Sequence, residues 1–173
     1  MSEPLLVPVP YEQFVDDIHA LAAAMAESGW VPDHIVGIGR GGLVPGAYLS
    51  HRTGISLLSV DYSAGVPGFS DELLAKLATA TQDGTRILLV DDINDSGGTI
   101  TALKTAFLGA GGAAEHFRVG VLIDNVRSAA KVDYRARAID RVEDKSWFVF
   151  PWEAMAPRET LIEEAEEVPE RLA

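Results

Sequence analysis

The sequence lacks cysteine altogether, has no long hydrophobic run and has few basic residues. Without cysteine there is no disulfide framework, no thiolate nucleophile and no thiolate metal site. No stretch reaches the roughly 18 apolar residues that a membrane-spanning helix needs. The first ten residues also lack the basic and apolar segments of a secretory signal. We therefore expect a cytoplasmic protein with no membrane partner.

The charge balance is strongly acidic. The chain has 14 Lys and Arg against 26 Asp and Glu, which gives a formal net charge of -12. An overall negative field repels phosphate backbones, so nucleic acid is not an expected partner. A small anion held by local donors remains compatible with this charge.

Apolar runs alternate with segments of helical spacing. A chain of 173 residues fits one domain. Strands are expected at 34–39, 56–62, 86–92 and 117–124, with a weaker one at 132–139, and helices at 11–28, 42–52, 70–80 and 98–109. This alternation predicts an α/β fold with a parallel sheet. The acidic stretch from Glu163 to Glu167 predicts the solvated face of a short C-terminal helix.

The strongest motif is LLVDDINDSGGTI, at residues 88–100. A buried strand ends in Asp91 and Asp92, and Asp95 follows before a turn of small residues opens a helix. Backbone N–H groups at such a helix start bind anions, and the helix dipole favours negative charge there. Paired carboxylates accept hydrogen bonds from neighbouring hydroxyls or hold Mg²⁺. Helix capping alone leaves two carboxylates unexplained, so the motif favours a sugar phosphate site.

The second motif is VGIGRGGLVPGA, at residues 36–47. Gly37, Gly39 and Gly42 satisfy the spacing of the dinucleotide fingerprint, but this spacing is common by chance. Arg40 places a cationic fork in the loop, which suits phosphate or pyrophosphate.

Together these motifs resemble the type I phosphoribosyltransferases, and the likeness covers nearly the whole chain. LLVDDINDSGGT is similar to the diphosphate-sugar motif of that superfamily. GIGRGGLVPGA, together with the segment SWFVFPWE at 146–153, is similar to the purine branch of xanthine-guanine and hypoxanthine phosphoribosyltransferases. The resemblance implies a parallel sheet of about five strands flanked by helices, with a small C-terminal hood. We expect one domain over 1–173, with a core at about 10–125, a hood at about 126–160 and an acidic tail.

The resemblance also implies an activity and a site. The protein would transfer phosphoribosyl from phosphoribosyl pyrophosphate (PRPP) to a purine such as guanine, xanthine or hypoxanthine, in nucleotide salvage, and would form a homodimer or higher homo-oligomer. The stretch 62–70 would be a mobile loop over the site. The implied roles are as follows: Asp91 and Asp92 for the ribose hydroxyls and Mg²⁺; Asp95, Ser96, Gly97, Gly98 and Thr99 for the 5-phosphate; Arg40 and Gly41 for pyrophosphate; Trp147, Phe148 and Asn125 for the base; and Asp95 as the general base.

The chain departs from the family at one base-reading position. Relatives that use 6-oxopurines usually carry a lysine after the fourth strand, where this chain has Asp124 or Asn125. Asn125 both donates and accepts hydrogen bonds, so it is a candidate for contact with a purine edge. Arg127 is a second candidate, and a surface position is the alternative for it. The sequence leaves the preferred base open.

Two other function classes compete with the enzyme. A regulator on the same fold would bind PRPP or a nucleotide without chemistry, but the chain has no basic nucleic-acid face and Asp95 is present. A dinucleotide-dependent oxidoreductase would rest on Gly37 to Gly42 and would leave residues 91–99 unexplained. The sequence therefore favours the transferase.

Overall fold

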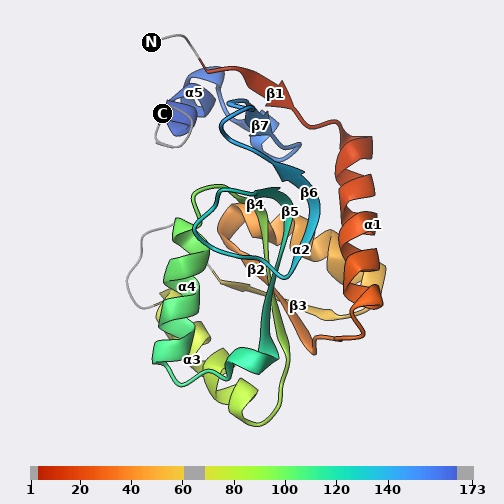
Figure 1. Ribbon diagram of the computed structural model, residues 1–173, viewed down its shortest axis with the longest axis vertical. Helices are drawn as coiled ribbons and strands as arrows, with labels where there is room; N and C mark the ends of the chain where they lie inside the picture. Colours follow the sequence, from red (N-terminus) through yellow and green to blue (C-terminus); the bar gives the residue numbers. More distant parts are fainter. Residues whose placement is uncertain (1–3, 61–68, 167–173) are drawn as a thin grey trace.

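A five-stranded parallel sheet forms the centre of the computed structural model, which describes residues 4–60 and 69–166 (Figure 1). Its strand order is β3-β2-β4-β5-β6, and every neighbouring pair is parallel. The predicted fold is confirmed. The strands are β2 (His34–Ile38), β3 (Ser56–Val60), β4 (Ile87–Asn94), β5 (Phe117–Asn125) and β6 (Tyr134–Ile139).

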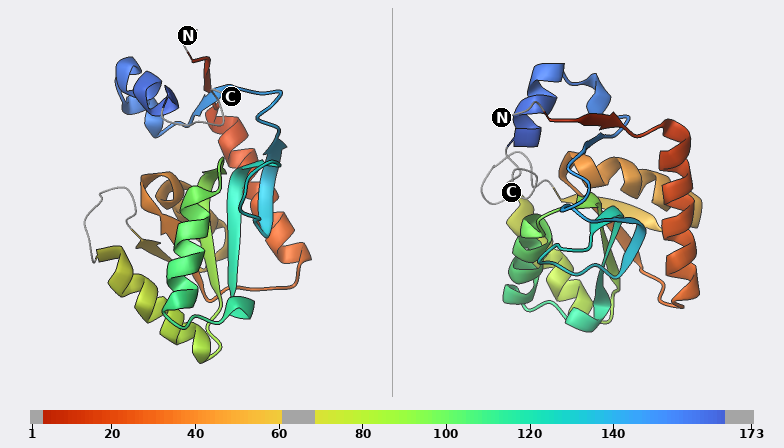
Figure 2. Two further views of the ribbon diagram at one scale, coloured as in Figure 1. Left: turned by 60° about the vertical axis from the view of Figure 1, so that its left-hand side comes forward. Right: turned by 45° about the horizontal axis from the view of Figure 1, so that its top comes forward.

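Helices cover both faces of this sheet. The helices α1 (Tyr11–Glu27) and α2 (Gly39–Thr53) lie on one face, and α3 (Phe69–Gln82) and α4 (Gly98–Gly109) lie on the other (Figures 1 and 2). Short 3-10 turns occupy Ala114–His116 and Glu153–Met155. Among the described residues, no helix is both long and apolar enough to cross a bilayer.

The central strand β4 explains why the sheet needs cover on both faces. Ile87 and Leu89 belong to the core under α3 and α4, whereas Leu88 and Val90 belong to the core under α1 and α2. Successive side chains of a strand point to opposite faces. A strand buried on both faces is therefore apolar throughout, as in parallel sheets of this kind.

A small hood lies beyond the carboxyl ends of the core strands (Figures 1 and 2). It contains β1 (Leu6–Pro8), which pairs in parallel with β7 (Trp147–Val149), and α5 (Arg158–Glu166). The hood thus includes an N-terminal strand, and β6, expected within the hood at 126–160, belongs to the core sheet. As an edge strand, β6 buries Tyr134 but leaves Arg135 and Ala138 exposed, so its sequence lacks a continuous apolar run.

Helix α2 begins earlier than the sequence predicts. It starts at Gly39 rather than at residue 42, so Arg40 and Gly41 lie in its first turn. Pro45, expected in the first turn, lies further along, where it has no N–H to donate to the carbonyl of Gly41. The predicted mobile loop at 62–70 falls mostly outside the described residues.

Candidate functional site

The first part of the site is the connection from β4 to α4. Asp91 and Asp92 lie in the second half of β4. The strand ends at Asn94, and Asp95 is the next residue. Gly97 then takes φ +89°, and α4 begins at Gly98. The first helical bond runs from the Thr101 N–H to the Gly97 carbonyl, 2.9 Å away. The N–H groups of this first turn have no carbonyl partners within the helix, so they form an anion-binding end.

The turn at Gly97 packs against a buried polar network formed by Ser128, Asn94 and Asp124. A Cβ on Gly97 would lie 2.5 Å from the Ala130 nitrogen and 2.7 Å from Ser128 Oγ. Ser128 Oγ in turn donates to Asn94 Oδ1 over 2.8 Å. Asn94 Nδ2 donates to Asp124 Oδ1, also over 2.8 Å. Gly97 therefore allows the turn to sit directly on this network.

Asp91 and Asp92 form a pair of neighbouring carboxylates. The Asp92 N–H donates to Asp91 Oδ1 at 3.1 Å, and the Ile93 N–H donates to Asp92 Oδ1 at 2.7 Å. Burial, followed by repulsion from Asp92, raises the pKa of Asp91 well above its ordinary value. Burial raises the pKa of Asp92 to about 6. A cation or a pair of hydroxyl donors placed here would favour the ionised forms.

The start of α2 lies against this carboxylate pair. A Cβ on Gly41 would lie 2.6 Å from Asp92 Oδ2, and a Cβ on Gly42 would lie 2.1 Å from the Val90 carbonyl oxygen. The two glycines therefore let the first turn of α2 contact β4. The Arg40 side chain is 83% exposed, with Nη2 4.0 Å from Glu164 Oε1 of α5. A second helix N-terminus thus borders the carboxylates, and Arg40 lies in its first turn.

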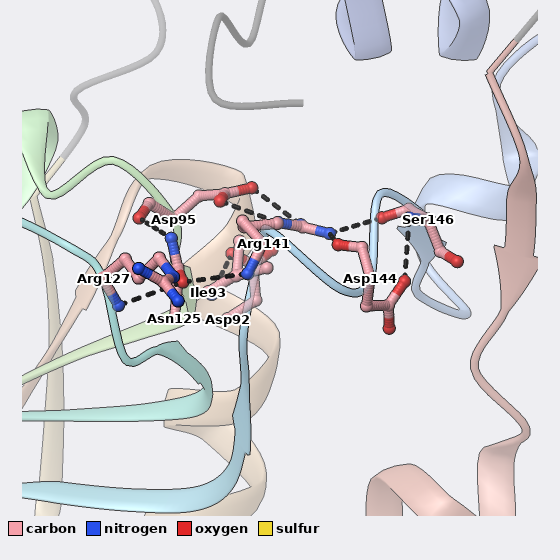
Figure 3. A network of polar contacts seen from close by, with 8 residues as sticks. All are labelled: Asp92, Ile93, Asp95, Asn125, Arg127, Arg141, Asp144 and Ser146. Carbon is pink, nitrogen blue, oxygen red and sulfur yellow. Dashed lines mark hydrogen bonds and ion pairs between the residues drawn. The ribbon is translucent and has the colours of Figure 1, made fainter. Parts of the chain in front are cut away.

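Asp95 is held by a buried arginine from the loop between β6 and β7 (Figure 3). Arg141 Nε lies 2.8 Å from Asp95 Oδ1, and Nη2 lies 2.7 Å from Asp95 Oδ2. Its Nη1 donates to the carbonyl of Asp144 at 3.2 Å and to that of Ser146 at 2.6 Å. The Arg141 side chain is 3% exposed and that of Asp95 is 14% exposed. This bidentate pair connects the phosphate turn to the segment that leads into β7.

Asn125, predicted to contact a base, is buried beside Asp95 (Figure 3). Its Nδ2 donates to the Asp95 carbonyl at 3.0 Å. Its Oδ1 accepts from the N–H of Arg127 at 3.2 Å and from that of Arg141 at 3.3 Å. The carboxamide therefore bonds three backbone groups of the site. The other candidate, Arg127, is an exposed residue whose Nε pairs with Asp140.

The hood contributes the aromatic residues of β7. The Trp147 N–H donates to the Leu5 carbonyl at 2.8 Å, which fixes β7 against the N-terminal strand. The Phe148 ring centre lies 5.4 Å from Arg141 Cζ. Trp152 stacks on Phe150, with ring centres 4.8 Å apart, and contacts Phe14 of α1, with ring centres 5.3 Å apart, so it packs the hood onto the core. Arg141 thus contacts both the Phe148 ring of β7 and the Asp95 carboxylate.

Sequence reasoning missed two charged residues of this region, Arg141 and Glu153. Burial, and then the negative charge of Asp92, raise the pKa of Glu153 to about 7. Its Oε2 accepts the Phe150 N–H at 2.9 Å. Glu153 belongs to the SWFVFPWE segment, which was a usable signal. Nothing local distinguishes Arg141 from its neighbours Arg135 and Arg137 in the sequence.

Comparisons with known proteins agree with this geometry. The model of the phosphoribosyl transferase domain family matches residues 10–157. The chain is 30% identical over 149 residues to the xanthine-guanine phosphoribosyltransferase of Gluconobacter oxydans, covering 84% of this chain and 83% of that one. It is 27% identical to the purine phosphoribosyltransferase of Pyrococcus horikoshii, with a TM-score of 0.64 over 87% of this chain and 96% of that one.

A more distant structure shares the fold. The hypoxanthine-guanine phosphoribosyltransferase of Leishmania tarentolae, solved with GMP, is 19% identical, with a TM-score of 0.58 over 82% of this chain and 84% of that one. With the match to the family model over most of the chain and the carboxylate pair between two helix N-termini, the conclusion is that this chain belongs to the phosphoribosyl transferase domain family.

Proposed function

We propose that the protein transfers the phosphoribosyl group of PRPP to a ring nitrogen of a purine base and releases pyrophosphate. One observation carries the proposal: the Asp91 and Asp92 pair lies between the N-terminus of α4 on one side and that of α2, with Arg40, on the other. PRPP presents vicinal hydroxyls between two phosphate-bearing ends, so the arrangement of these groups fits its three parts.

The carboxylate pair is suited to the ribose. Asp91 and Asp92 would each accept from one of the 2- and 3-hydroxyls. Their oxygen atoms are also the hard ligands that Mg²⁺ prefers, and Mg²⁺ is commonly bound by one or two carboxylates plus substrate oxygens. Bound Mg²⁺ supplies positive charge that stabilises the departing pyrophosphate.

The two helix starts divide the phosphates between them. Residues Asp95 to Thr99 would hold the 5-phosphate through the N–H groups at the start of α4. Arg40 and the Gly41 N–H would hold the pyrophosphate, and the exposure of the Arg40 side chain leaves it free to close on a ligand. A guanidinium forms bidentate bonds with such oxyanions.

The base would stack on Trp147, with backbone groups of Phe148 at its edge. Its attacking nitrogen forms a bond to C1 of the ribose while the bond from C1 to the pyrophosphate oxygen breaks, and pyrophosphate leaves with the electron pair. The proton on the other imidazole nitrogen passes to Asp95. Each Asp95 oxygen keeps a second lone pair beside its bond to Arg141, so this acceptor role is compatible with the ion pair.

Asn125 takes a supporting role in this proposal. Its amide bonds the backbone of Asp95, Arg127 and Arg141 rather than facing a ligand. Asn125 would hold Asp95 in place, because hydrogen bonds from neighbouring residues fix the orientation of catalytic groups.

The decisive experiment mixes the protein with PRPP, Mg²⁺ and, separately, hypoxanthine, guanine, xanthine and adenine, and measures pyrophosphate release. Release with at least one base supports the proposal. Binding of PRPP without release with any base would overturn it in favour of a ligand-sensing regulator.

Asp95→Asn tests the general-base assignment. We expect kcat to fall at least about tenfold, because general bases contribute roughly 10²–10⁴ in rate. The substitution also weakens the partner of a buried guanidinium, so the variant should unfold at a lower temperature. Activity is therefore compared where circular dichroism shows the native fold. Unchanged kcat would remove Asp95 from this role.

A further inference from the structure

We propose that Arg141 determines base specificity, and that its guanidinium selects purines with a hydrogen-bond acceptor at C6 over those with an amino group there. The proposal deepens the proposed function and rests on it. No sequence motif pointed to this residue, and Arg141 enters the site only through the tertiary structure (Figure 3).

The first step is the position of Arg141 relative to the proton acceptor. Both Asp95 oxygens accept from the guanidinium, at 2.8 and 2.7 Å. In a purine, the nitrogen that loses the proton to Asp95 is bonded to C5, the neighbour of C6, so this nitrogen and the C6 substituent lie on the same edge of the base. A cation bonded to Asp95 therefore lies next to that substituent when the base is positioned for attack.

The second step is the count of donors. A guanidinium has five N–H groups. Four of them are used, because Nε and Nη2 each donate to Asp95 and Nη1 donates to the carbonyls of Asp144 and Ser146. Among the side chains that the structure describes, at 4–60 and 72–166, Asp95 is the one acceptor of Nη2, so its second hydrogen has no partner there. The guanidinium is planar, so this hydrogen points out from the end of the group, between the Asp95 carboxylate on one side and the carbonyls of Asp144 and Ser146 on the other.

The third step is rigidity. Arg141 is 3% exposed, its backbone N–H donates to Asn125 Oδ1, and its guanidinium lies against the Phe148 ring, 5.4 Å from Cζ to the ring centre. The group therefore cannot easily turn away to suit a different ligand. A fixed donor bonds a carbonyl oxygen but faces an amino group donor to donor, and sites of this kind discriminate strongly.

The positive charge of Arg141 also favours a 6-oxopurine. As a 6-oxopurine loses its proton, negative charge spreads onto the oxygen at C6. A buried cation stabilises that charge where water is excluded. Neither residue at the position of the family's lysine is a cation: Asp124 is bonded to Asn94 and Arg135, and Asn125 to backbone groups. Arg141 is thus the cation whose placement suits this task.

The test compares kcat/KM for hypoxanthine and adenine in wild type, Arg141→Met and Arg141→Lys, with PRPP saturating. We expect Arg141→Met to lower the ratio of hypoxanthine to adenine kcat/KM at least tenfold, and Arg141→Lys to restore part of it. Arg86→Met serves as the control, since Arg86 is exposed and directly precedes β4, at the opposite end of that strand from Asp91 and Asp92, and it should leave the ratio as in wild type.

An unchanged ratio in Arg141→Met, with both bases equally slowed, would overturn the proposal and leave Arg141 a purely structural residue. If that variant does not fold, the ¹⁵N resonances of the arginine side chains in wild type replace it. One Nη resonance should shift on addition of IMP and not of AMP, and equal shifts would overturn the proposal. Failure of wild type to turn over any base contradicts the proposed function instead, so the two outcomes remain distinct.

Discussion

Replacing Gly97 with alanine tests whether the phosphate turn depends on contact with the network beneath it. Two costs add. Gly97 has φ +89°, and a residue with a Cβ in this region costs about 1–2 kcal/mol. The new Cβ would also lie 2.5 Å from the Ala130 nitrogen and 2.9 Å from Ala130 Cβ, and such overpacking costs about 1–3 kcal/mol more. We expect a loss of about 2–5 kcal/mol in the free energy of unfolding.

Gly84→Ala separates the two costs. Gly84 has nearly the same φ, +91°, but its Cβ would meet no heavy atom within 4 Å. This variant should lose only about 1–2 kcal/mol. Urea unfolding measures both losses, and fluorescence titration with PRPP measures binding. Gly97→Ala should bind PRPP at least tenfold more weakly because the start of α4 shifts, whereas Gly84→Ala should bind it as wild type does. Equal destabilisation and unchanged PRPP binding would refute the reasoning.

Two further substitutions test other parts of the site. The pKa of Glu153 is about 7 in the folded protein against an ordinary 4.5, so the folded state retains a proton between these pH values and the wild type loses stability as pH rises from 4.5 to 7. Glu153→Gln should abolish the loss of stability that comes from this group, which is about 1–2 kcal/mol after allowance for partial exposure. Urea unfolding of wild type and variant from pH 4.5 to 8 measures the free energy of unfolding. If it depends on pH in the same way in both proteins, the prediction is wrong. Gly42→Ala places a Cβ 2.1 Å from the Val90 carbonyl oxygen, which should cost at least about 3 kcal/mol or prevent folding. Gly109→Ala, with open space at its Cβ, is the control, and similar thermal stability of both variants would disprove the close packing of α2 on β4.

The β4-to-α4 connection could be read from the sequence because its geometry is local. A buried apolar strand, three aspartates and a run of small residues lie within 88–100, and α4 spans Gly98–Gly109 as expected. The family model matches residues 10–157, a range that includes this segment and residues 36–47. The mobile loop, the homo-oligomer and the individual ligand contacts stay predictions.

Local pattern was less informative where an element depends on its neighbours. The start of α2 was placed three residues late, since the glycines at 39–42 read as a loop until their contact with β4 is known. The hood was drawn from the C-terminal part alone, although β1 pairs with β7 across the length of the chain. A strand of three residues carries too little periodicity to reveal such a partner.

The sequence by itself determined the core strands, the carboxylate pair and the anion-binding start of α4, because each arises from residues adjacent in the chain. Only the tertiary structure decided which cation meets Asp95. Arg141 lies 46 positions away in a segment with several arginines, and its selection depends on the course of β6, the Asn125 amide and the carbonyls before β7. Hydrogen bonding of a buried charge is set by the groups that surround it in space, and these come from separate parts of the chain.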